Sequence, residues 1–155
     1  MSNVPSPAPG SPSPDEVGAP CFVPPEVLER VAQLSDEALD ALPFGVVGLD
    51  EAGRVIRYNR FESELAQVPR AAATGADFFA ELAPCTGNAL VRGRFEAGVA
   101  RGALDTCFPF TFSYRMTPTP VRLHLYRCPR SGTYWLFVEP EPGFPTATPV
   151  PYRRL

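Results

Sequence analysis

Lysine is absent from this sequence of 155 residues, in which all 14 basic residues are arginine. Without a lysine amine, no side chain can form a Schiff base with retinal or pyridoxal phosphate, and the lysine of a phosphate-binding P-loop is missing as well. The net charge is -3 and no basic block occurs, so the electrostatic footprint of a nucleic-acid-binding protein is missing too. These absences argue against three common classes of site and partner.

Long apolar runs are also missing. The longest, such as FGVVGL at 44–49, fall far short of the ~20 residues that span a bilayer. The N-terminus has no charged segment followed by a hydrophobic one, as a signal peptide would. We therefore expect a cytoplasmic protein.

Histidine occurs once, at His124, and the four cysteines form no C-x-x-C pair. Zinc and iron–sulfur sites need paired Cys/His spacing, and a cysteine protease would have to recruit its histidine from a strand, so both are disfavoured. Cys107 and Cys128 lie in strand patterns, where cysteine is usually a small apolar filler. Cys85 follows Pro84 in a loop, which suits either a buried inert thiol or a nucleophile that faces a pocket.

Proline is concentrated at the two ends of the chain, with eight of the 20 in residues 1–25 and five in 139–155. The N-terminal part has almost no bulky apolar residue, so it cannot bury enough surface to offset chain entropy. We predict a disordered Pro/Ser-rich leader at 1–25, one folded domain at 26–140 and a flexible Pro-rich tail at 141–155.

Residues 26–43 are predicted to form a helical cap of two short helices. PPEVLERVAQL begins with prolines that suit a helix entrance and repeats apolar residues at Val27, Val31 and Leu34. In SDEALDALP, Ser35 is placed to act as the N-cap of the second helix.

Strand patterns make up much of the remaining sequence. FGVVGLDEAGRVIRYN gives two apolar runs around a turn at 50–53, and LDTCFPFTFSYRM, VRLHLYRC and TYWLFVE predict three more strands. Pro118 and Pro120 are expected to mark a turn, and the helix in NALVRGRFEAGVARG to end at Gly102. His124 alternates away from the apolar positions and is expected at the surface. The order of elements predicts an α+β fold of the PAS type, a five-stranded antiparallel sheet flanked by helices.

Tyr58 and Glu62 stand four residues apart after the second strand, and by themselves suggest a packed tyrosine and a solvated glutamate. Taken in order, however, RYN with Glu62, FFAELAPCTGN, FEAGVARGALDT, FTFSYRMTPT and TYWLFV closely resemble the photoactive yellow protein family. This family consists of PAS-fold bacterial blue-light receptors, and the resemblance covers about residues 26–140.

The resemblance implies that Cys85 carries p-coumaric acid (4-hydroxycinnamic acid) as a covalent thioester. Tyr58 and Glu62 would donate hydrogen bonds to its phenolate oxygen, and a carboxyl beside that anion in a dry pocket would be protonated in the dark. Light would isomerise the double bond from trans to cis, Glu62 would give up its proton, and the buried charge would partly unfold the protein as the signal. The residues predicted to bind the chromophore are Cys85, Tyr58, Glu62, Ala66, Val68, Ala83, Pro84, Thr86, Phe112, Tyr114 and Met116.

Two positions depart from the pattern of the family. Where its best-known members have a threonine that supports the tyrosine hydroxyl and an arginine that caps the pocket, this chain has Ala66 and Val68. We expect a less constrained Tyr58 hydroxyl, with a shifted absorption band or phenol pKa.

Two alternative functions remain open on the sequence. One is a chromophore-free PAS module for interaction or ligand sensing, and the other is a thiol redox sensor or thiol enzyme that uses Cys85. A flavin photoreceptor is disfavoured, because Cys85 lies in APCTGN and not in the Asn-Cys-Arg-Phe setting of such domains. The expected protein is a monomeric sensor and not an enzyme, with an unidentified signalling partner and no nucleic-acid or membrane partner.

Overall fold

The structure is a computed structural model that describes residues 22–112 and 119–140. None of the helices in these two ranges is long and apolar enough to cross a membrane. The helical elements are α1 Pro25–Arg30, η1 Val31–Gln33, α2 Asp36–Asp40, α3 Arg60–Ala66, α4 Arg70–Ala73, η2 Phe78–Leu82, η3 Pro84–Thr86 and α5 Arg92–Arg101. The strands are β1 Gly45–Leu49, β2 Val55–Tyr58, β3 Asp105–Phe112, β4 Thr119–Arg127 and β5 Tyr134–Pro140.

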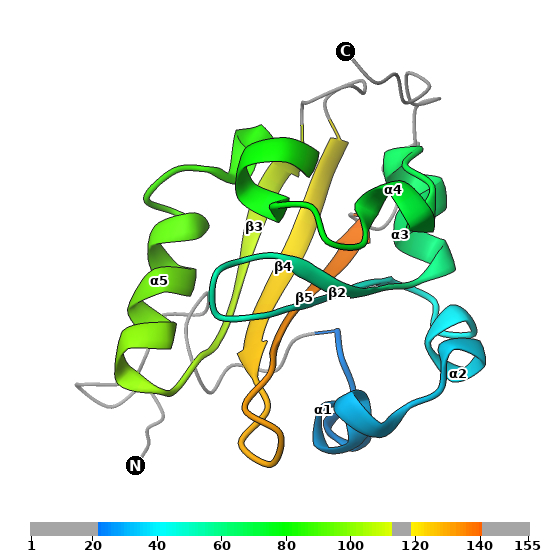
Figure 1. Cartoon of the computed structure of the whole chain (residues 1–155), viewed down its shortest axis with the longest axis horizontal. Helices are drawn as coiled ribbons and strands as arrows, with labels where there is room; N and C mark the ends of the chain where they lie inside the picture. Colours follow the sequence, from blue (N-terminus) through cyan, green and yellow to red (C-terminus); the bar gives the residue numbers. More distant parts are fainter. Residues whose placement is uncertain (1–21, 113–118, 141–155) are drawn as a thin grey trace, which may run out of the picture.

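The five strands form one antiparallel sheet in the order β2-β1-β5-β4-β3 (Figure 1). The hairpin β1–β2 therefore pairs with the last strand and not with β3. This order places β5 at the centre of the sheet, between the first strand of the chain and the fourth.

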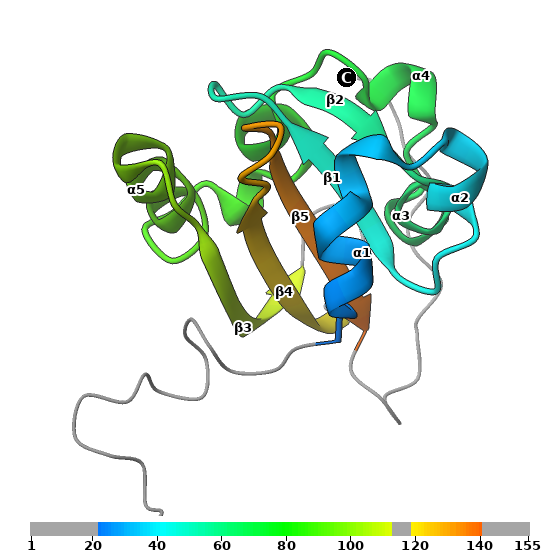
Figure 2. The same ribbon diagram turned by 90° about the horizontal axis from the view of Figure 1, so that it is seen from below.

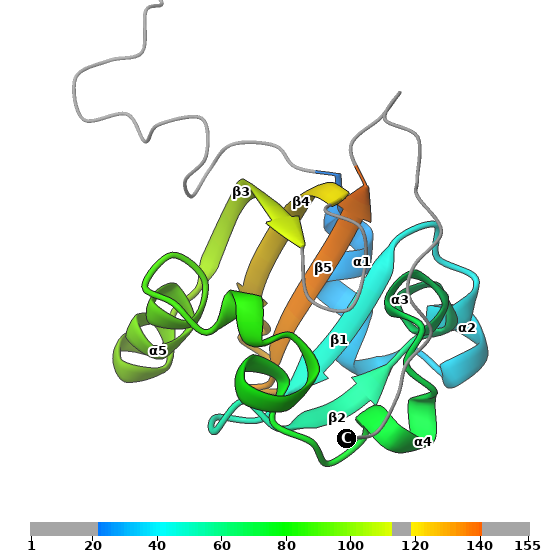
Figure 3. The same ribbon diagram turned by 90° about the horizontal axis from the view of Figure 1, so that it is seen from above.

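Both faces of the sheet are covered, and each carries its own hydrophobic cluster. Along β5, Trp135 and Phe137 pack with the cap and its neighbours, whereas Leu136 and Val138 pack with residues of α3 and α5. Figures 2 and 3, two views turned in opposite directions, show α1 on one side of the sheet and α5 on the other. Strict alternation along the strands thus separates two interiors.

The predicted succession of two strands, helices and three strands is confirmed. Ser35 caps α2, because its hydroxyl oxygen accepts a hydrogen bond from the Ala38 amide at 3.1 Å. The turn between β1 and β2 contains Gly53 with a φ of 88°, and α5 ends at Gly102 with a φ of 70°. Glycine adopts these left-handed conformations without the steric cost that a Cβ brings.

The expected turn around Pro118 and Pro120 is wrong for the second of these residues. Pro120 lies inside β4 and pairs with Thr111 of β3. A proline is tolerated there because it is close to the beginning of its strand, where one missing amide removes little pairing. Pro118 lies outside the described residues.

The expected surface position of His124 is also wrong. This residue is only 4% exposed, and its ring contacts those of Tyr126 and Phe137. Its Nε2 atom lies 2.7 Å from the Asp105 carboxylate. Alternation correctly placed His124 opposite the apolar positions of β4, but the second face of this sheet is covered and does not meet water.

Helix α3 ends at Gln67, which has a left-handed φ of 58°. A non-glycine residue pays for this conformation, so we expect Gln67→Gly to raise the free energy of unfolding by about 1 kcal/mol in urea denaturation. Gln67→Ala keeps the Cβ and removes the hydrogen bond from Gln67 Nε2 to the Glu64 carbonyl, so it should be no more stable than the parent. Equal stability of the two variants would contradict this explanation.

Candidate functional site

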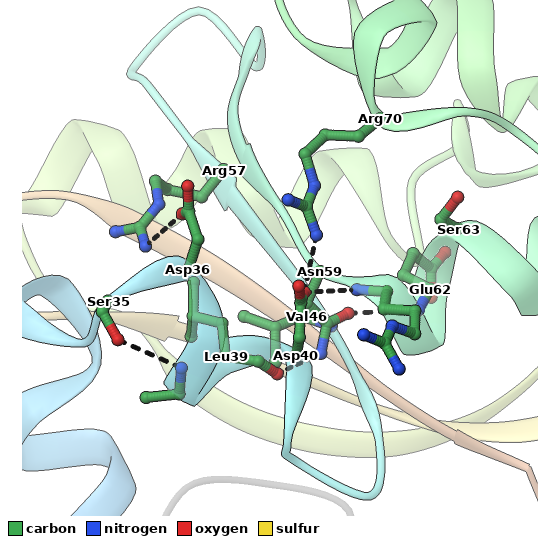
Figure 4. A network of polar contacts seen from close by, with 12 residues as sticks. Ser35, Asp36, Leu39, Asp40, Val46, Arg57, Asn59, Glu62, Ser63 and Arg70 are labelled. Atoms are coloured by element: carbon green, nitrogen blue, oxygen red, sulfur yellow. Dashed lines mark hydrogen bonds and ion pairs between the residues drawn. The ribbon is translucent and has the colours of Figure 1, made fainter.

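Asn59 follows β2 and precedes α3, and its side chain is fully buried. Its Oδ1 atom accepts hydrogen bonds from the amides of Val46 at 2.9 Å and Glu62 at 3.1 Å. Its Nδ2 atom donates to the carbonyls of Leu39 at 2.8 Å and Phe44 at 3.0 Å. One side chain therefore ties α2, the beginning of β1 and the first turn of α3 together (Figure 4).

Asn59 is the N-cap of α3, and the side chain of Glu62 takes no part in capping this helix. In a capping box the acidic residue at the third helical position bonds back to the N-cap amide. Here the Asn59 amide instead donates to the Val46 carbonyl at 3.1 Å. The N-x-x-E pattern at 59–62 is the local signal in the sequence for this helix start.

Glu62 is an acid in a dry environment. It is 2% exposed, and its Oε1 atom is buried without a hydrogen-bond partner among the residues that the structure describes. Burial raises the pKa of Glu62 from an ordinary value of 4.5 to about 8, so the carboxyl carries a proton at neutral pH. The prediction of a protonated acid is thus consistent with the structure, whereas the simpler reading of a solvated glutamate is wrong.

Tyr58 is the last residue of β2 and is 4% exposed. Burial raises the pKa of its hydroxyl above the ordinary value, and the charge of Glu62 raises it further. Tyr58 and Glu62 are therefore close enough to influence each other electrostatically, and both are neutral near pH 7. Two neutral O–H groups are two potential hydrogen-bond donors.

Cys85 lies on a tight turn after the π-helical turn η2. The Thr86 amide and hydroxyl both donate to the Ala83 carbonyl, at 2.8 and 2.6 Å, and the Gly87 amide donates to the Pro84 carbonyl at 3.0 Å. None of these three turn hydrogen bonds uses the Cys85 amide. The cysteine is half-buried, and this short 3-10 turn fixes its backbone.

One hydrophobic cluster, on the face of the sheet opposite the cap, brings most of the predicted site residues together. The pair Tyr58 and Glu62 comes from β2 and α3, whereas Cys85 comes from η3. Tyr58, Val68 and Phe112 are buried in this cluster, and Ala66, Ala83 and Cys85 are half-buried against it. Thr86 is fully buried beside Cys85, and Pro84 is exposed. Tyr114 and Met116 lie outside the described residues.

Two other cysteines are described, and neither belongs to this cluster. Cys107 is buried in β3 and disulfide-bonded, so it is more than the apolar filler predicted. Cys128 is buried on the cap face, which agrees with the predicted apolar filler, although it lies just beyond the end of β4. Burial opposes ionisation of Cys128, but hydrogen bonds from Ser131 and Arg130 outweigh it and hold the thiol pKa below its ordinary value.

Other candidate sites in the described ranges are few. Three or more His, Cys, Asp or Glu side chains placed to hold a metal ion do not occur in 22–112 and 119–140. A surface hollow of about 250 Å³ between α2 and α3 contains none of the predicted site residues, since it is lined by Glu37, Asp40, Ala41 and Arg60.

Known proteins resemble this chain over most of its length, although no protein-family model matches it. Photoactive yellow protein from Rhodothalassium salexigens is 38% identical over 114 residues, which cover 74% of this chain and 91% of that protein. The protein of the same name from Halochromatium salexigens is 37% identical over 114 residues, with the same coverage. The chain belongs to the photoactive yellow protein family.

Solved structures support the same assignment. The photoactive yellow protein domain of the sensor histidine kinase Ppr from Rhodospirillum centenum is 36% identical, with a TM-score of 0.69, and the match covers 72% of this chain and 98% of that domain. A PAS domain of an HTR-like protein from Haloarcula marismortui has a TM-score of 0.53 at 14% identity and so shows the fold alone. The predicted PAS fold is confirmed, and the photoactive yellow protein relatives indicate a PAS-type photoreceptor.

The raised pKa of Glu62 predicts how stability depends on pH. Between pH 4.5 and about 8 the folded chain holds a proton on Glu62 that the unfolded chain has released, so stability falls as pH rises through this window. In the chromophore-free protein we expect a loss on the order of 5 kcal/mol across it, relative to Glu62→Gln. Urea denaturation at several pH values measures this difference. A constant difference between parent and variant would show that Glu62 is not buried as an acid.

Proposed function

We propose that this chain is a blue-light photoreceptor that holds p-coumaric acid as a thioester on Cys85. The observation that carries the proposal is the buried Glu62 oxygen, which has no hydrogen-bond partner among the described residues and lies next to Tyr58, in the same interior that Cys85 contacts. A buried phenolate needs strong donors, and a protonated carboxyl with a tyrosine hydroxyl supplies two. The bound group supplies absorption of visible light and a double bond that light isomerises.

Attachment needs only an activated acyl donor, such as a p-coumaroyl thioester. The Cys85 sulfur attacks the acyl carbon, a new thioester bond forms, the carbon–sulfur bond of the donor breaks, and the thiol proton leaves with the departing thiol. Half-buried Cys85 is within reach of such a donor. Its amide, which none of these turn hydrogen bonds uses, would donate to the thioester carbonyl.

Glu62 is the proposed source of the proton that moves after light absorption. Once it has given up that proton, an unpaired carboxylate remains in a dry interior, at a cost of several kcal/mol. The Glu62 amide shares Asn59 with the Leu39 carbonyl of the cap, so a shift at the acid disturbs the attachment of the cap.

Release of the cap, residues 26–43, is the proposed signal. In the described ranges, two ion pairs hold it to the rest of the fold: Arg57 with Asp36 at 2.9 Å and Arg70 with Asp40 at 2.6 Å (Figure 4). Pairs of this exposed kind are each worth about 1 kcal/mol or less, so they do not prevent opening. Opening would uncover the apolar cap face of the sheet. We propose that a cytoplasmic signalling partner reads this change in a monomeric receptor.

Covalent loading is the first test. Protein treated with p-coumaric anhydride, or co-expressed with a source of p-coumaroyl thioester, should turn yellow, gain the mass of one coumaroyl group and bleach under blue light. Cys85→Ala should stay colourless and unmodified, whereas Cys128→Ala, which removes the other free thiol of the described region, should load like the parent. Folded parent protein without an adduct would refute the proposal and favour a chromophore-free PAS module. Reaction of Cys85 with electrophiles of every kind would favour a thiol sensor.

Ala66 stands where the best-known members of the family have threonine, and this difference predicts an altered absorption band. Ala66 is half-buried against the cluster that contains Tyr58, and it offers no hydroxyl to hold that phenol. Ala66→Thr should therefore shift the absorption maximum of the loaded protein and the pKa of the bound phenol, as measured by a spectrophotometric titration. Ala66→Val, which adds similar volume without a hydroxyl, is the control. If Ala66→Thr leaves both quantities unchanged, the missing hydroxyl has no role in tuning.

A further inference from the structure

The first residue of β1, Gly45, lies against the side chain of Glu62. A Cβ added to Gly45 would overlap Glu62 Oε1 and would lie 3.2 Å from Glu62 Cβ and 3.3 Å from Glu62 Cδ. The φ of Gly45 is not in the left-handed region, which among described glycines is occupied by residues 53, 75, 102 and 132. Backbone conformation therefore does not require glycine at position 45, whereas the space that Glu62 fills does.

Neither backbone is free to move aside. Gly45 pairs with Val138 in the register of β1 and β5, and the next residue, Val46, pairs with Phe137. The Glu62 amide is held by Asn59, which also accepts a hydrogen bond from the Val46 amide. Because β1 and the start of α3 are tied by this one side chain, a clash between residues 45 and 62 has to be relieved by rotation of the Glu62 carboxyl.

We propose that Gly45 is a positioning residue, which directs the Glu62 carboxyl into the dry interior beside Tyr58 by leaving room for it against β1. Any larger residue at position 45 would turn the acid out of this place. The expected loss of a hydrogen bond to a bound phenolate rests on the proposed photoreceptor function. The placement of the Glu62 carboxyl does not depend on that function, and it can be measured in the chromophore-free protein.

Gly48 provides a matched control on the same strand. A Cβ added to Gly48 would also be crowded, at 3.0 Å from Arg57 Cβ and 3.0 Å from Trp135 Cζ3, but the atoms nearest to it do not include Glu62. Gly48→Ala therefore tests what crowding of β1 does in general, and Gly45→Ala adds the effect on the acid.

The first experiment is a titration of Glu62 by infrared spectroscopy of the chromophore-free protein, with Glu62→Gln used to assign the carboxylic C=O band. Gly45→Ala should lower the pKa of Glu62 by about one unit or more, because a displaced carboxyl reaches water or polar groups. Gly48→Ala should leave it unchanged, and Tyr58, the titratable group that couples to Glu62, is the same in both. An unchanged Glu62 pKa in Gly45→Ala overturns the proposal.

The second experiment is a double-mutant cycle in urea. If the carboxyl fills the space, Gly45→Ala should lower the unfolding midpoint in the parent and have little effect in a Glu62→Ala background. Gly48→Ala should lower the midpoint equally in both backgrounds. Equal loss from Gly45→Ala in the two backgrounds overturns the proposal. Should Gly45→Ala alone fail to fold, recovery of folding in the double variant supports it, and failure to recover overturns it.

The third experiment uses protein loaded with p-coumaric acid. Gly45→Ala should shift the absorption band and Gly48→Ala should not, because only the first moves a donor to the phenolate. An unshifted band in loaded Gly45→Ala overturns the functional part of the inference. If the parent does not load, the proposed function fails, while the titration and the cycle still decide whether Gly45 positions the acid.

Discussion

The arrangement of the site depends on the hydrogen bonds of the Asn59 side chain. All four of its hydrogen bonds go to backbone groups, in α2, in the segment before β1, in β1 and in α3. Because these groups are buried, losing the amide would leave donors and acceptors without water or partner, at about 1 to 3 kcal/mol for each group. A bond to the backbone fixes where a segment lies, and so the same residue sets the position of the acid and of the cap.

The buried acid is tolerable only while it is neutral. A small domain is stable by about 5 to 15 kcal/mol, and an uncompensated buried carboxylate takes a substantial share of that total. In the neutral form the cost is that of a polar group with one oxygen that finds no partner in the described part of the chain. The position of one proton therefore decides how much of the stability of the fold remains. A light-driven device can use such a residue, because moving a proton needs no large displacement of the chain.

Much of the fold could be predicted because local patterns agreed with the global arrangement. Alternation found the strands, and the caps at Ser35 and Gly102 marked helix ends. The predictions failed where the burial of a residue depends on a segment that covers the second face of the sheet. A periodic pattern does not reveal a covering segment, so it predicts the polar face of β4 at the surface, whereas His124 on that face is buried.

The site residues could be predicted from the resemblance to a known family, whereas physical arguments from the sequence explained only some of their roles. Spacing alone gave Tyr58 and Glu62 no special status, because burial of the acid arises from segments that are distant in the sequence. Asn59 had a local signal in its N-x-x-E pattern, but its bonds to Leu39 and Phe44 did not. Gly45 had no local signal, because the need for a small residue at the start of β1 becomes clear only once the Glu62 side chain is placed against it.

Because β5 lies at the centre of the sheet, the sheet can be completed only after β5 has been synthesised. Residues 134–140 emerge from the ribosome after the other four strands of the described sheet, yet they fill the gap between the β1–β2 hairpin and the β3–β4 hairpin. Until then, each hairpin offers an open edge and half of an apolar interior, which is the condition under which nascent chains associate wrongly. The apolar interior can therefore close only after residues 134–140 have left the ribosome.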